Sequence, residues 1–218
     1  MYPIGTHPFV EYSVASVVMS ESFDQKCDEI AFVTGHHAEQ VRSYFGDSYF
    51  GADIRYIEQA EQRGTGHAVD CARRALGFDD AIVWLADLYV PSSLFDRIRR
   101  HCLQSVLTVA TDEDEENDDV RIDFDDRCIL RSWRGSSAYF DIGLWKLGSE
   151  ILSRICDSKT TEYRVLLNVQ SAIEAGAEIG YQIADEWVHL GGLHPTVSEN
   201  VRRVIDRMNR EEPIFDYI

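Results

Sequence analysis

Short apolar runs recur along the first half of the chain, and each is followed by a stretch with helical spacing. The apolar runs are rich in β-branched and aromatic residues, which is typical of buried strands. Strands are therefore expected at residues 29–35, 54–57, 81–87 and 105–110. Apolar residues three or four positions apart predict helices at about residues 10–19, 36–46, 68–76 and 91–101. This alternation predicts an α/β fold with a Rossmann-like, mostly parallel sheet and helices on both faces.

After residue 118 the alternation gives way to strand-like runs at residues 120–124, 128–133 and 138–147. Consecutive strands indicate a small antiparallel addition over about residues 118–147. Further on, we expect helices at about 149–155 and 162–175, a strand at 178–183 and a last helix at about 195–208. No repeat or low-complexity linker divides the sequence, so a single domain over residues 1–218 is expected.

The composition is that of a folded protein, with 44% hydrophobic residues. No run approaches the ~18 to 20 apolar residues of a membrane span, and no basic segment followed by an apolar one opens the chain. We therefore expect a soluble, cytoplasmic protein with no membrane partner. The five cysteines are widely spaced and form no Cys-x-x-Cys pair, which favours reduced thiols over a disulfide framework or a zinc site.

The formal net charge of −17 is the most unbalanced feature of the composition. Such acidity argues against a nucleic acid as partner, because binding to phosphate backbones requires basic patches. Much of the charge lies in residues 112–126. A charge run of this kind is usually a solvated loop. A surface that binds a divalent cation or a partner, and adaptation to high salt, remain open alternatives.

The first candidate for chemistry is the segment of residues 59–69, which joins a predicted strand to a predicted helix. It contains Gly64-Thr65-Gly66. Glycine lets the backbone approach a ligand closely, and the unpaired N–H groups at the start of a helix attract anions or carbonyl groups. Taken alone, a Gly-x-Gly turn is structural more often than functional.

Two other features are candidate ligand sites. Asp87 ends a predicted buried strand, and in open parallel sheets ligands bind beyond the carboxyl ends of the strands. Asp87 is therefore a candidate site residue. The pair His36-His37 is a weaker candidate for metal binding, because adjacent residues at a helix start do not face one site.

Five segments of the chain resemble the NTP-transferase family, the sugar-1-phosphate nucleotidylyltransferases. Residues 59–68, Gln-Ala-Glu-Gln-Arg-Gly-Thr-Gly-His-Ala, are nearly the base-binding loop of N-acetylglucosamine-1-phosphate uridylyltransferases. Residues 3–12 are similar to the family's Pro-Val-Gly-Gly-Lys-Pro-Leu-Ile-Glu-Tyr, and residues 187–191 stand where the family has Trp-x-Asp-x-Gly. The remaining two likenesses are residues 33–41 and Asp87. The likeness runs along nearly the whole chain.

The resemblance implies that an NTP, with a pyrimidine base favoured, and a sugar-1-phosphate are the ligands. Gln59 would hydrogen-bond the base, since its amide offers both a donor and an acceptor. Backbone and hydroxyl contacts to the nucleotide would come from Gly64, Thr65 and Gly66. The family reaction joins the nucleotidyl group of an NTP to a sugar-1-phosphate and releases pyrophosphate.

The resemblance also implies a metal site and a sugar site. Asp87 would hold Mg²⁺ on the phosphates, together with His189 at the position of the family's second metal-binding Asp. Neutral imidazole is a poor ligand for Mg²⁺, so this departure puts the metal site in doubt. Asp141 and Gly143 fall near the family's Asn-x-Gly, which contacts the sugar.

The family's first strand, its Gly-x-Gly-Thr-Arg-Leu loop and a following lysine do not occur in these 218 residues. These parts neutralise phosphate charge, so we expect weak or no transferase activity from the chain as it stands. Two interpretations stay open: an active enzyme whose N-terminal residues are absent from this sequence, or a degenerate homologue that acts as a nucleotide-binding, regulatory or partner subunit. Unpaired sheet edges would favour a homo-oligomer or a partner subunit.

Overall fold

The structure is a computed structural model that describes residues 3–4, 7–35, 38–111, 120–155 and 164–189. Its helices are α1 (Phe9–Val18), α2 (Ala38–Phe45), α3 (Thr65–Leu76), α4 (Ser92–Arg100), α5 (Ser149–Ile155) and α6 (Val165–Glu174). The longer strands are β3 (Glu29–Thr34), β5 (Ala52–Glu58), β6 (Ala81–Trp84), β8 (Val106–Thr111), β11 (Tyr139–Leu147) and β12 (Gly180–Ile183).

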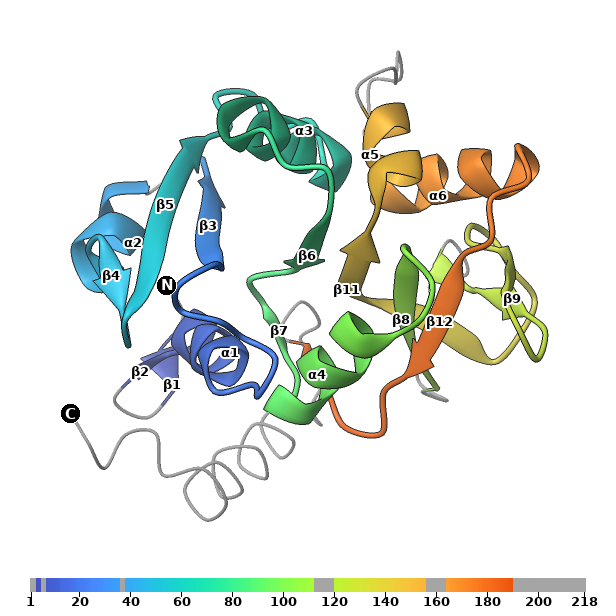
Figure 1. Cartoon of the computed structure of the whole chain (residues 1–218), viewed down its shortest axis with the longest axis horizontal. Helices are drawn as coiled ribbons and strands as arrows, with labels where there is room; N and C mark the ends of the chain where they lie inside the picture. The colour runs from blue at the N-terminus through green and yellow to red at the C-terminus, as the bar shows by residue number, and fades with distance from the viewer. Residues whose placement is uncertain (1–2, 5–6, 36–37, 112–119, 156–163, 190–218) are drawn as a thin grey trace.

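Two sheets form the centre of the molecule (Figure 1). In one, β5 pairs in parallel with β3 and antiparallel with β4 (Ser48–Tyr49). In the other, the strand order is β12-β8-β11-β6, with β12 parallel to β8 and β11 antiparallel to both of its neighbours. No strand among the described residues joins β3 to β6. The α/β fold class is confirmed.

Three short strand pairs complete the described part of the chain. Strands β1 (Pro3–Ile4) and β2 (His7–Pro8) precede α1. Strand β7 (Leu88–Tyr89) pairs with β13 (Val188–His189), and β9 (Asp123–Phe124) pairs with β10 (Ile129–Arg131). The acidic residues 112–119, the pair His36-His37 and the helix predicted at 195–208 lie outside the described residues.

The antiparallel addition predicted at about 118–147 divides between two places in the fold. Strands β9 and β10 form a small hairpin, whereas β11 lies in the four-stranded sheet between β8 and β6. Strand β11 is nine residues long and is buried along most of its length, including Phe140, Leu144 and Leu147. A strand that is apolar on both faces is stable only in the interior of a sheet that is covered on both sides.

Helix α1 connects the two sheets through the larger hydrophobic core. Val14 and Val17 of α1 belong to the same buried cluster as Ile30 of β3 and Leu144 of β11. The hydroxyl groups of Ser13 and Ser16 donate to the backbone carbonyl oxygens of Leu88 and Val90, the latter at 2.5 Å. Small, polar residues in the middle of this helix therefore let it pack directly against the β7 segment.

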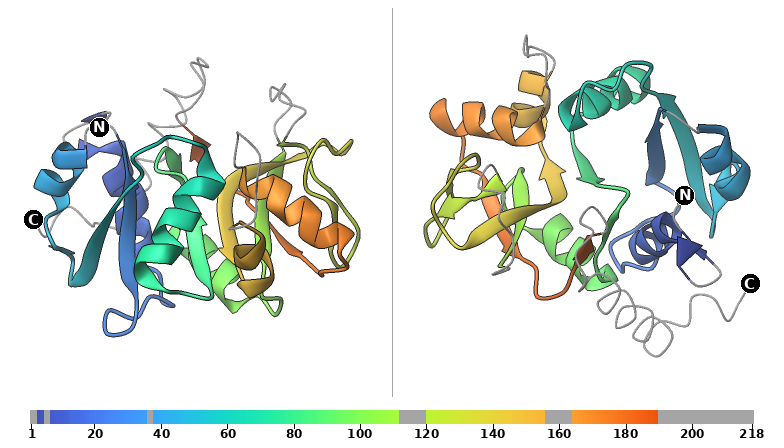
Figure 2. Two further views of the ribbon diagram at one scale, coloured as in Figure 1. Left: turned by 90° about the horizontal axis from the view of Figure 1, so that it is seen from above. Right: turned by 180° about the vertical axis from the view of Figure 1, so that it is seen from behind.

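The second core lies under α5 and α6, on the far side of the four-stranded sheet (Figure 2). There Ile151, Leu152 and Val169 pack with Leu107 and Trp145. Helix α3 lies between the two halves, because it contacts β3 and β5 as well as α5 and α6. Within the described residues no helix is both long and apolar enough to cross a membrane.

The buried carboxylate of Glu11 connects α1 to neighbouring elements by hydrogen bonds. The sequence pattern did not predict this burial. Glu11 is 3% exposed. It accepts hydrogen bonds from the hydroxyl groups of Tyr44 and Tyr49 and lies 2.8 Å from Nδ1 of His7. Burial, together with the nearby Glu11 carboxylate, raises the pKa of both tyrosines well above the usual value. Both phenols therefore remain protonated donors at neutral pH.

The contact between α1 and the β7 segment can be tested with Ser16→Ala. This change leaves the buried carbonyl of Val90 without its donor, so the free energy of unfolding should fall by about 1–3 kcal/mol in urea denaturation. Ser43→Ala, on the exposed face of α2, is the matched control and should stay within about 0.5 kcal/mol of the wild type. Equal stability of the two variants would contradict this assignment.

Candidate active site

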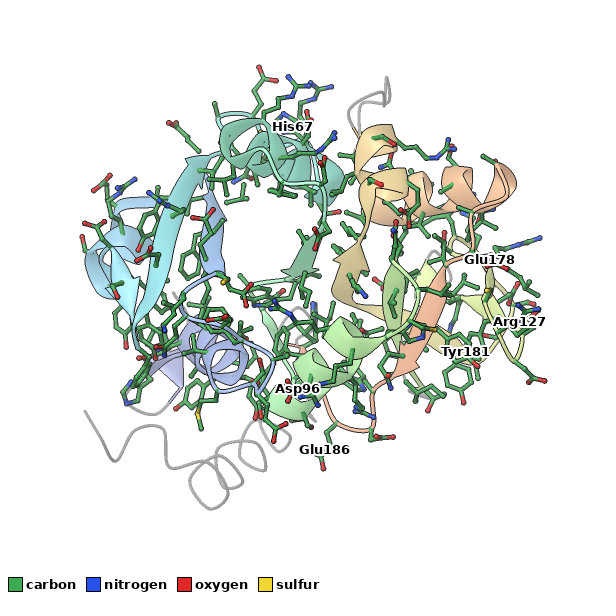
Figure 3. The ribbon with its side chains drawn as sticks, in the orientation of Figure 1. His67, Asp96, Arg127, Glu178, Tyr181 and Glu186 are labelled. Carbon is green, nitrogen blue, oxygen red and sulfur yellow. The ribbon has the colours of Figure 1, made fainter. Side chains whose placement is uncertain are left out.

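The loop after β5 holds the side chain of Gln59 in a fixed position. The backbone N–H of Gln59 donates to Thr34 O at 2.7 Å, which anchors the loop to the end of β3. The side-chain Nε2 of Gln59 lies 3.2 Å from Gly64 O and 3.0 Å from Nδ1 of His67. The amide that the sequence singled out is thus oriented by its own loop and by the first turn of α3, where Figure 3 shows His67.

Glycines occupy two positions around this loop. Gly64 precedes α3 with φ of +97°, a conformation that favours glycine. Gly35, which follows β3, faces the loop so closely that a Cβ atom there would lie 2.9 Å from Nε2 of Gln62. Both positions let backbone segments approach one another at the carboxyl ends of β3 and β5.

Thr65 and Gly66 begin α3 and are less exposed to solvent than Gly64. The Thr65 hydroxyl accepts a hydrogen bond from the backbone N–H of Val165, at 3.3 Å, which links the loop to α6. Gly66 is buried, whereas Gly64 is exposed. Of the predicted nucleotide-binding residues, Gly64 and the half-buried Gln59 and Thr65 are therefore accessible, whereas Gly66 is buried.

Asp87 and His189, which the resemblance assigns to one metal site, lie beside each other. His189 lies opposite Leu88 in the β7–β13 pair, which places it beside the residue that precedes Leu88. The distance from His189 Nε2 to Asp87 Oδ1 is 3.4 Å. The hydrogen bond from His189 holds the pKa of Asp87 below its usual value, so Asp87 is a carboxylate at neutral pH.

Asp141, on β11, lies in the electrostatic field of the same histidine. Its Oδ1 accepts a hydrogen bond of 2.7 Å from Nε1 of Trp145, across a register shift in the pairing of β11 with β8. Removal of the carboxyl group from water raises the pKa of Asp141 to about 7, although the hydrogen bonds from Trp145 and from the backbone of Gly143 oppose this shift. Asp141 therefore exists in both protonation states near neutral pH.

Gly143 has a clear structural reason to be glycine. Its φ is +86°, and a Cβ atom there would lie 2.5 Å from Cδ1 of Leu85. Its carbonyl accepts the N–H of Leu85 at 3.0 Å, which closes the end of the β6–β11 pair. Gly143 is buried, so any contact with a sugar would involve its backbone.

The predicted site residues thus form two groups, one on each sheet. Gln59, Gly64, Thr65 and Gly66 lie at the junction of β5 and α3, and Asp87, Asp141, Gly143 and His189 lie around the ends of β6, β11 and β13. Sequence reasoning missed His67 and Trp145, which orient Gln59 and Asp141. His67 lies in α3 and Trp145 in β11, and the spacing of neither residue indicates a role in a site. His67 does lie inside the segment that resembles the family.

The sequence model of the family described as nucleotidyl transferase matches residues 6–121, which is more than half of the chain. The chain belongs to the nucleotidyl transferase family.

Relatives include the bifunctional protein GlmU of Geotalea daltonii, 37% identical over 116 residues that make up 51% of this chain and 24% of that protein. GlmU of Methanococcus maripaludis is 25% identical over 208 residues, 92% of this chain and 48% of that protein. A glucose-1-phosphate thymidylyltransferase of Streptomyces antibioticus is 32% identical over 97 residues, 44% of this chain and 26% of that protein. The chain thus spans about half or less of the length of these relatives.

Solved structures share the fold of this chain. A UDP-glucose pyrophosphorylase in complex with UDP-glucose has a TM-score of 0.74 at 18% identity, covering 95% of this chain and 90% of that one. A glucose-1-phosphate thymidylyltransferase from Bacillus anthracis has a TM-score of 0.76 at 19% identity, covering 94% and 85%. At such identities the likeness extends to the fold alone.

The elevated pKa of Asp141 predicts a pH dependence of stability in this nucleotidyl transferase family member. The folded state holds a proton on Asp141 up to about pH 7, whereas an unfolded Asp loses it near pH 3.9. The stabilisation is complete below about pH 4 and is lost as the pH rises through about 7. Asn does not ionise, so the Asp141→Asn variant should not lose this stability as the pH rises.

In urea denaturation, Asp141→Asn should therefore gain stability relative to the wild type when the pH is raised from 5 to 8, by on the order of a few kcal/mol. Asp126→Asn, at an exposed position, should show no such gain. If the free energies of unfolding of the wild type and Asp141→Asn differed equally at both pH values, the pKa of Asp141 would not be raised.

Proposed function

We propose that this chain binds a pyrimidine NTP and transfers its nucleotidyl group to a sugar-1-phosphate, with release of pyrophosphate. The observation that supports this most is the fixed amide of Gln59, held by Gly64 and His67 at the strand-to-helix loop of a nucleotidyl transferase family member. Relatives that are named as transferases of this kind support the same reaction.

In this proposal the base lies against the loop of residues 59–66. A uracil or thymine edge presents carbonyl acceptors and an N–H donor, and the side-chain oxygen of Gln59 can accept a hydrogen bond from that N–H. Because Nε2 of Gln59 already bonds to Gly64 O and to His67, the amide orientation is set before the nucleotide arrives. Such preorganisation lowers the entropic cost of binding. The exposed backbone of Gly64 allows the close approach of the flat base.

Asp87 would hold Mg²⁺ on the phosphates. Mg²⁺ in phosphate-transfer sites is commonly bound through one or two carboxylates, with substrate phosphates and water filling the other positions, so a single ionised carboxylate fits. His189 does not fit this ion, since imidazole suits softer metals. Among the described residues no group of three or more His, Cys, Asp and Glu side chains is arranged to hold a metal without a substrate. The ion supplies charge neutralisation on the phosphates when bound.

Asp141 and the backbone of Gly143 would contact the sugar-1-phosphate. With a pKa of about 7, set by burial, Asp141 can accept a hydrogen bond from a sugar hydroxyl or donate one. The catalytic work of the protein would consist of positioning, so that the sugar phosphate oxygen attacks the α-phosphorus in line with the departing pyrophosphate.

The reaction is tested by pyrophosphate release from UTP, dTTP and CTP, each combined with a panel of sugar-1-phosphates. We expect only slow release, because the Gly-x-Gly-Thr-Arg-Leu loop of the family does not occur in these 218 residues, and we expect it to need Mg²⁺, one of these nucleotides and one sugar-1-phosphate together. Absence of release from every combination, together with absence of nucleotide binding in calorimetry, would rule out the proposal.

The nucleotide position is tested with Gln59→Ala. The loss of the amide removes one hydrogen bond to the base and the contacts that fix the loop, so UTP should bind about 10-fold more weakly in calorimetry. Gln40→Ala, on the exposed face of α2, is the control and should bind UTP as the wild type does. Unchanged affinity of Gln59→Ala would place the base elsewhere.

The metal position is tested with two changes in opposite directions. Asp87→Asn should weaken Mg²⁺ binding in the presence of UTP by at least about tenfold, because the ionised ligand is lost. His189→Asp supplies a second carboxylate and should strengthen the binding of Mg²⁺. Asp79→Asn is the control, since the Asp79 side chain is 83% exposed. Equal Mg²⁺ affinity in all variants would remove Asp87 from the metal site.

A further inference from the structure

The side-chain amide of Gln59 has one polar atom that its neighbours do not use. Its Nε2 lies 3.2 Å from Gly64 O and 3.0 Å from Nδ1 of His67. An amide nitrogen carries two hydrogens, so these two contacts use both of them. Among the described residues nothing donates to Oε1 of Gln59. The half-buried side chain therefore offers a ligand an acceptor only, rather than the donor and acceptor expected from the sequence.

The orientation of this amide determines which nitrogen of His67 carries a hydrogen. A backbone carbonyl has no hydrogen to donate, so only the amide nitrogen of Gln59 can bond to Gly64 O. The same nitrogen faces His67, and the ring must therefore accept its second hydrogen. Nδ1 of His67 then carries no hydrogen, and an imidazole in this form has its hydrogen on Nε2.

Cys71 lies at the other nitrogen of the same ring. His67 and Cys71 are four residues apart on α3, where Figure 3 labels His67, so both lie on one face of the helix. Sγ of Cys71 is 3.7 Å from Nε2 of His67. Sulfur is a weak acceptor and fits the hydrogen on Nε2. Burial raises the pKa of the Cys71 thiol, so at neutral pH the sulfur has no negative charge that would favour an imidazolium.

These contacts hold the amide oxygen of Gln59 away from the loop. A rotation of the amide by half a turn would place Oε1 against Gly64 O and against Nδ1 of His67. Both of these atoms are acceptors, so the rotated amide would lose two hydrogen bonds and gain none. The loop itself is anchored, since the backbone N–H of Gln59 donates to Thr34 O at 2.7 Å. A ligand at this loop therefore meets an acceptor in a fixed position.

Pyrimidine bases differ in the ring atom that can meet such an acceptor. N3 of uracil and of thymine carries a hydrogen, whereas N3 of cytosine is itself an acceptor. The outward oxygen of Gln59 accepts from the first kind of base and repels the second. Rotation of the amide to suit cytosine would break its bonds to Gly64 and His67. A site that is built to hydrogen-bond one group rejects an analogue that lacks it.

We propose that His67 is a specificity-determining residue, which holds the Gln59 oxygen outward and so makes the loop select uracil or thymine nucleotides over cytosine nucleotides. His67 acts through Gln59 and is a positioning residue. The inference rests on the proposed function in one respect, namely that the base lies against Gln59. It adds a choice among the pyrimidines and a structural cause for that choice.

The form of the ring can be tested without a ligand. In the full chain labelled with nitrogen-15, long-range proton–nitrogen NMR spectra distinguish a ring nitrogen that carries a hydrogen from one that does not. We expect the hydrogen of His67 on Nε2 and none on Nδ1. A hydrogen on Nδ1 in the free chain would overturn the proposal, because Nδ1 could then not accept from Gln59.

The selectivity is tested by calorimetry with UTP and with CTP, in the presence of Mg²⁺. The wild type should bind UTP at least about tenfold more tightly than CTP. His67→Phe keeps a ring but removes the acceptor, so the amide can rotate and the ratio of the two affinities should fall by about 3- to 10-fold. A purely structural role of His67 would instead weaken both nucleotides by the same factor.

Two further variants complete this comparison. His67→Asn places an acceptor oxygen where Nδ1 stood and should retain the wild-type ratio. Ala75→Leu, at an exposed position of the same helix, is the matched control and should also retain it. His67→Leu repeats the removal of the acceptor and decides the result if His67→Phe does not fold.

The outcomes separate this inference from the proposed function. Equal affinity of the wild type for UTP and CTP, or an unchanged ratio when the acceptor is removed, would overturn the inference and leave the proposed function standing. A ratio that falls equally in His67→Asn and His67→Phe would also overturn it, since the acceptor would then not be the cause. Absence of binding of both nucleotides would overturn the proposed function and the inference with it.

Discussion

In the described part of the fold, side-chain packing connects the two sheets, whereas backbone hydrogen bonds would connect the strands of one continuous sheet. Strands β3 and β6 are each paired on one side only, so the two sheets share no backbone ladder among the described residues. Their connection comes from α1, whose Val14 packs in a core with residues of both sheets, and from α3, which contacts β3 and α5. This explains why α1 carries buried Ser13 and Ser16 and the buried Glu11, since polar anchors fix the position of a helix that apolar contacts alone would let slide.

The same division runs through the candidate site. The loop that orients Gln59 belongs to the sheet of β3 and β5, while Asp87, Asp141 and His189 belong to the sheet of β6 and β11 and to β13. Each group is internally ordered: Gln59 by Gly64 and His67, and Asp141 by Trp145. A ligand that touches both groups would therefore help to hold the sheets together, and its affinity would depend on how firmly they are already held.

The sequence predicted the elements that local periodicity determines. It did not predict the features that depend on contacts between residues far apart in the chain. Periodicity located β3, β5, α3 and α4 to within a few residues, and the glycines at Gly64 and Gly46 marked the helix limits. The place of β11 between β8 and β6 was not predicted, because consecutive strands in sequence need not be neighbours in a sheet. The elevated pKa of Asp141 and the burial of Glu11 arise from contacts between separate elements, which no spacing rule reveals. The contact of Asp87 with His189 was anticipated only through resemblance to the family.

The separation of the two sheets also affects how stability is distributed. Where packing alone connects them, each sheet and its helices can open as a separate unit at a free energy below that of global unfolding. A ligand that contacts both the loop of Gln59 and the region of Asp87 binds only when both parts are in place, so it would raise the free energy of that separate opening. The division of the site thus follows from two sheets that share no backbone ladder in the described part of the chain.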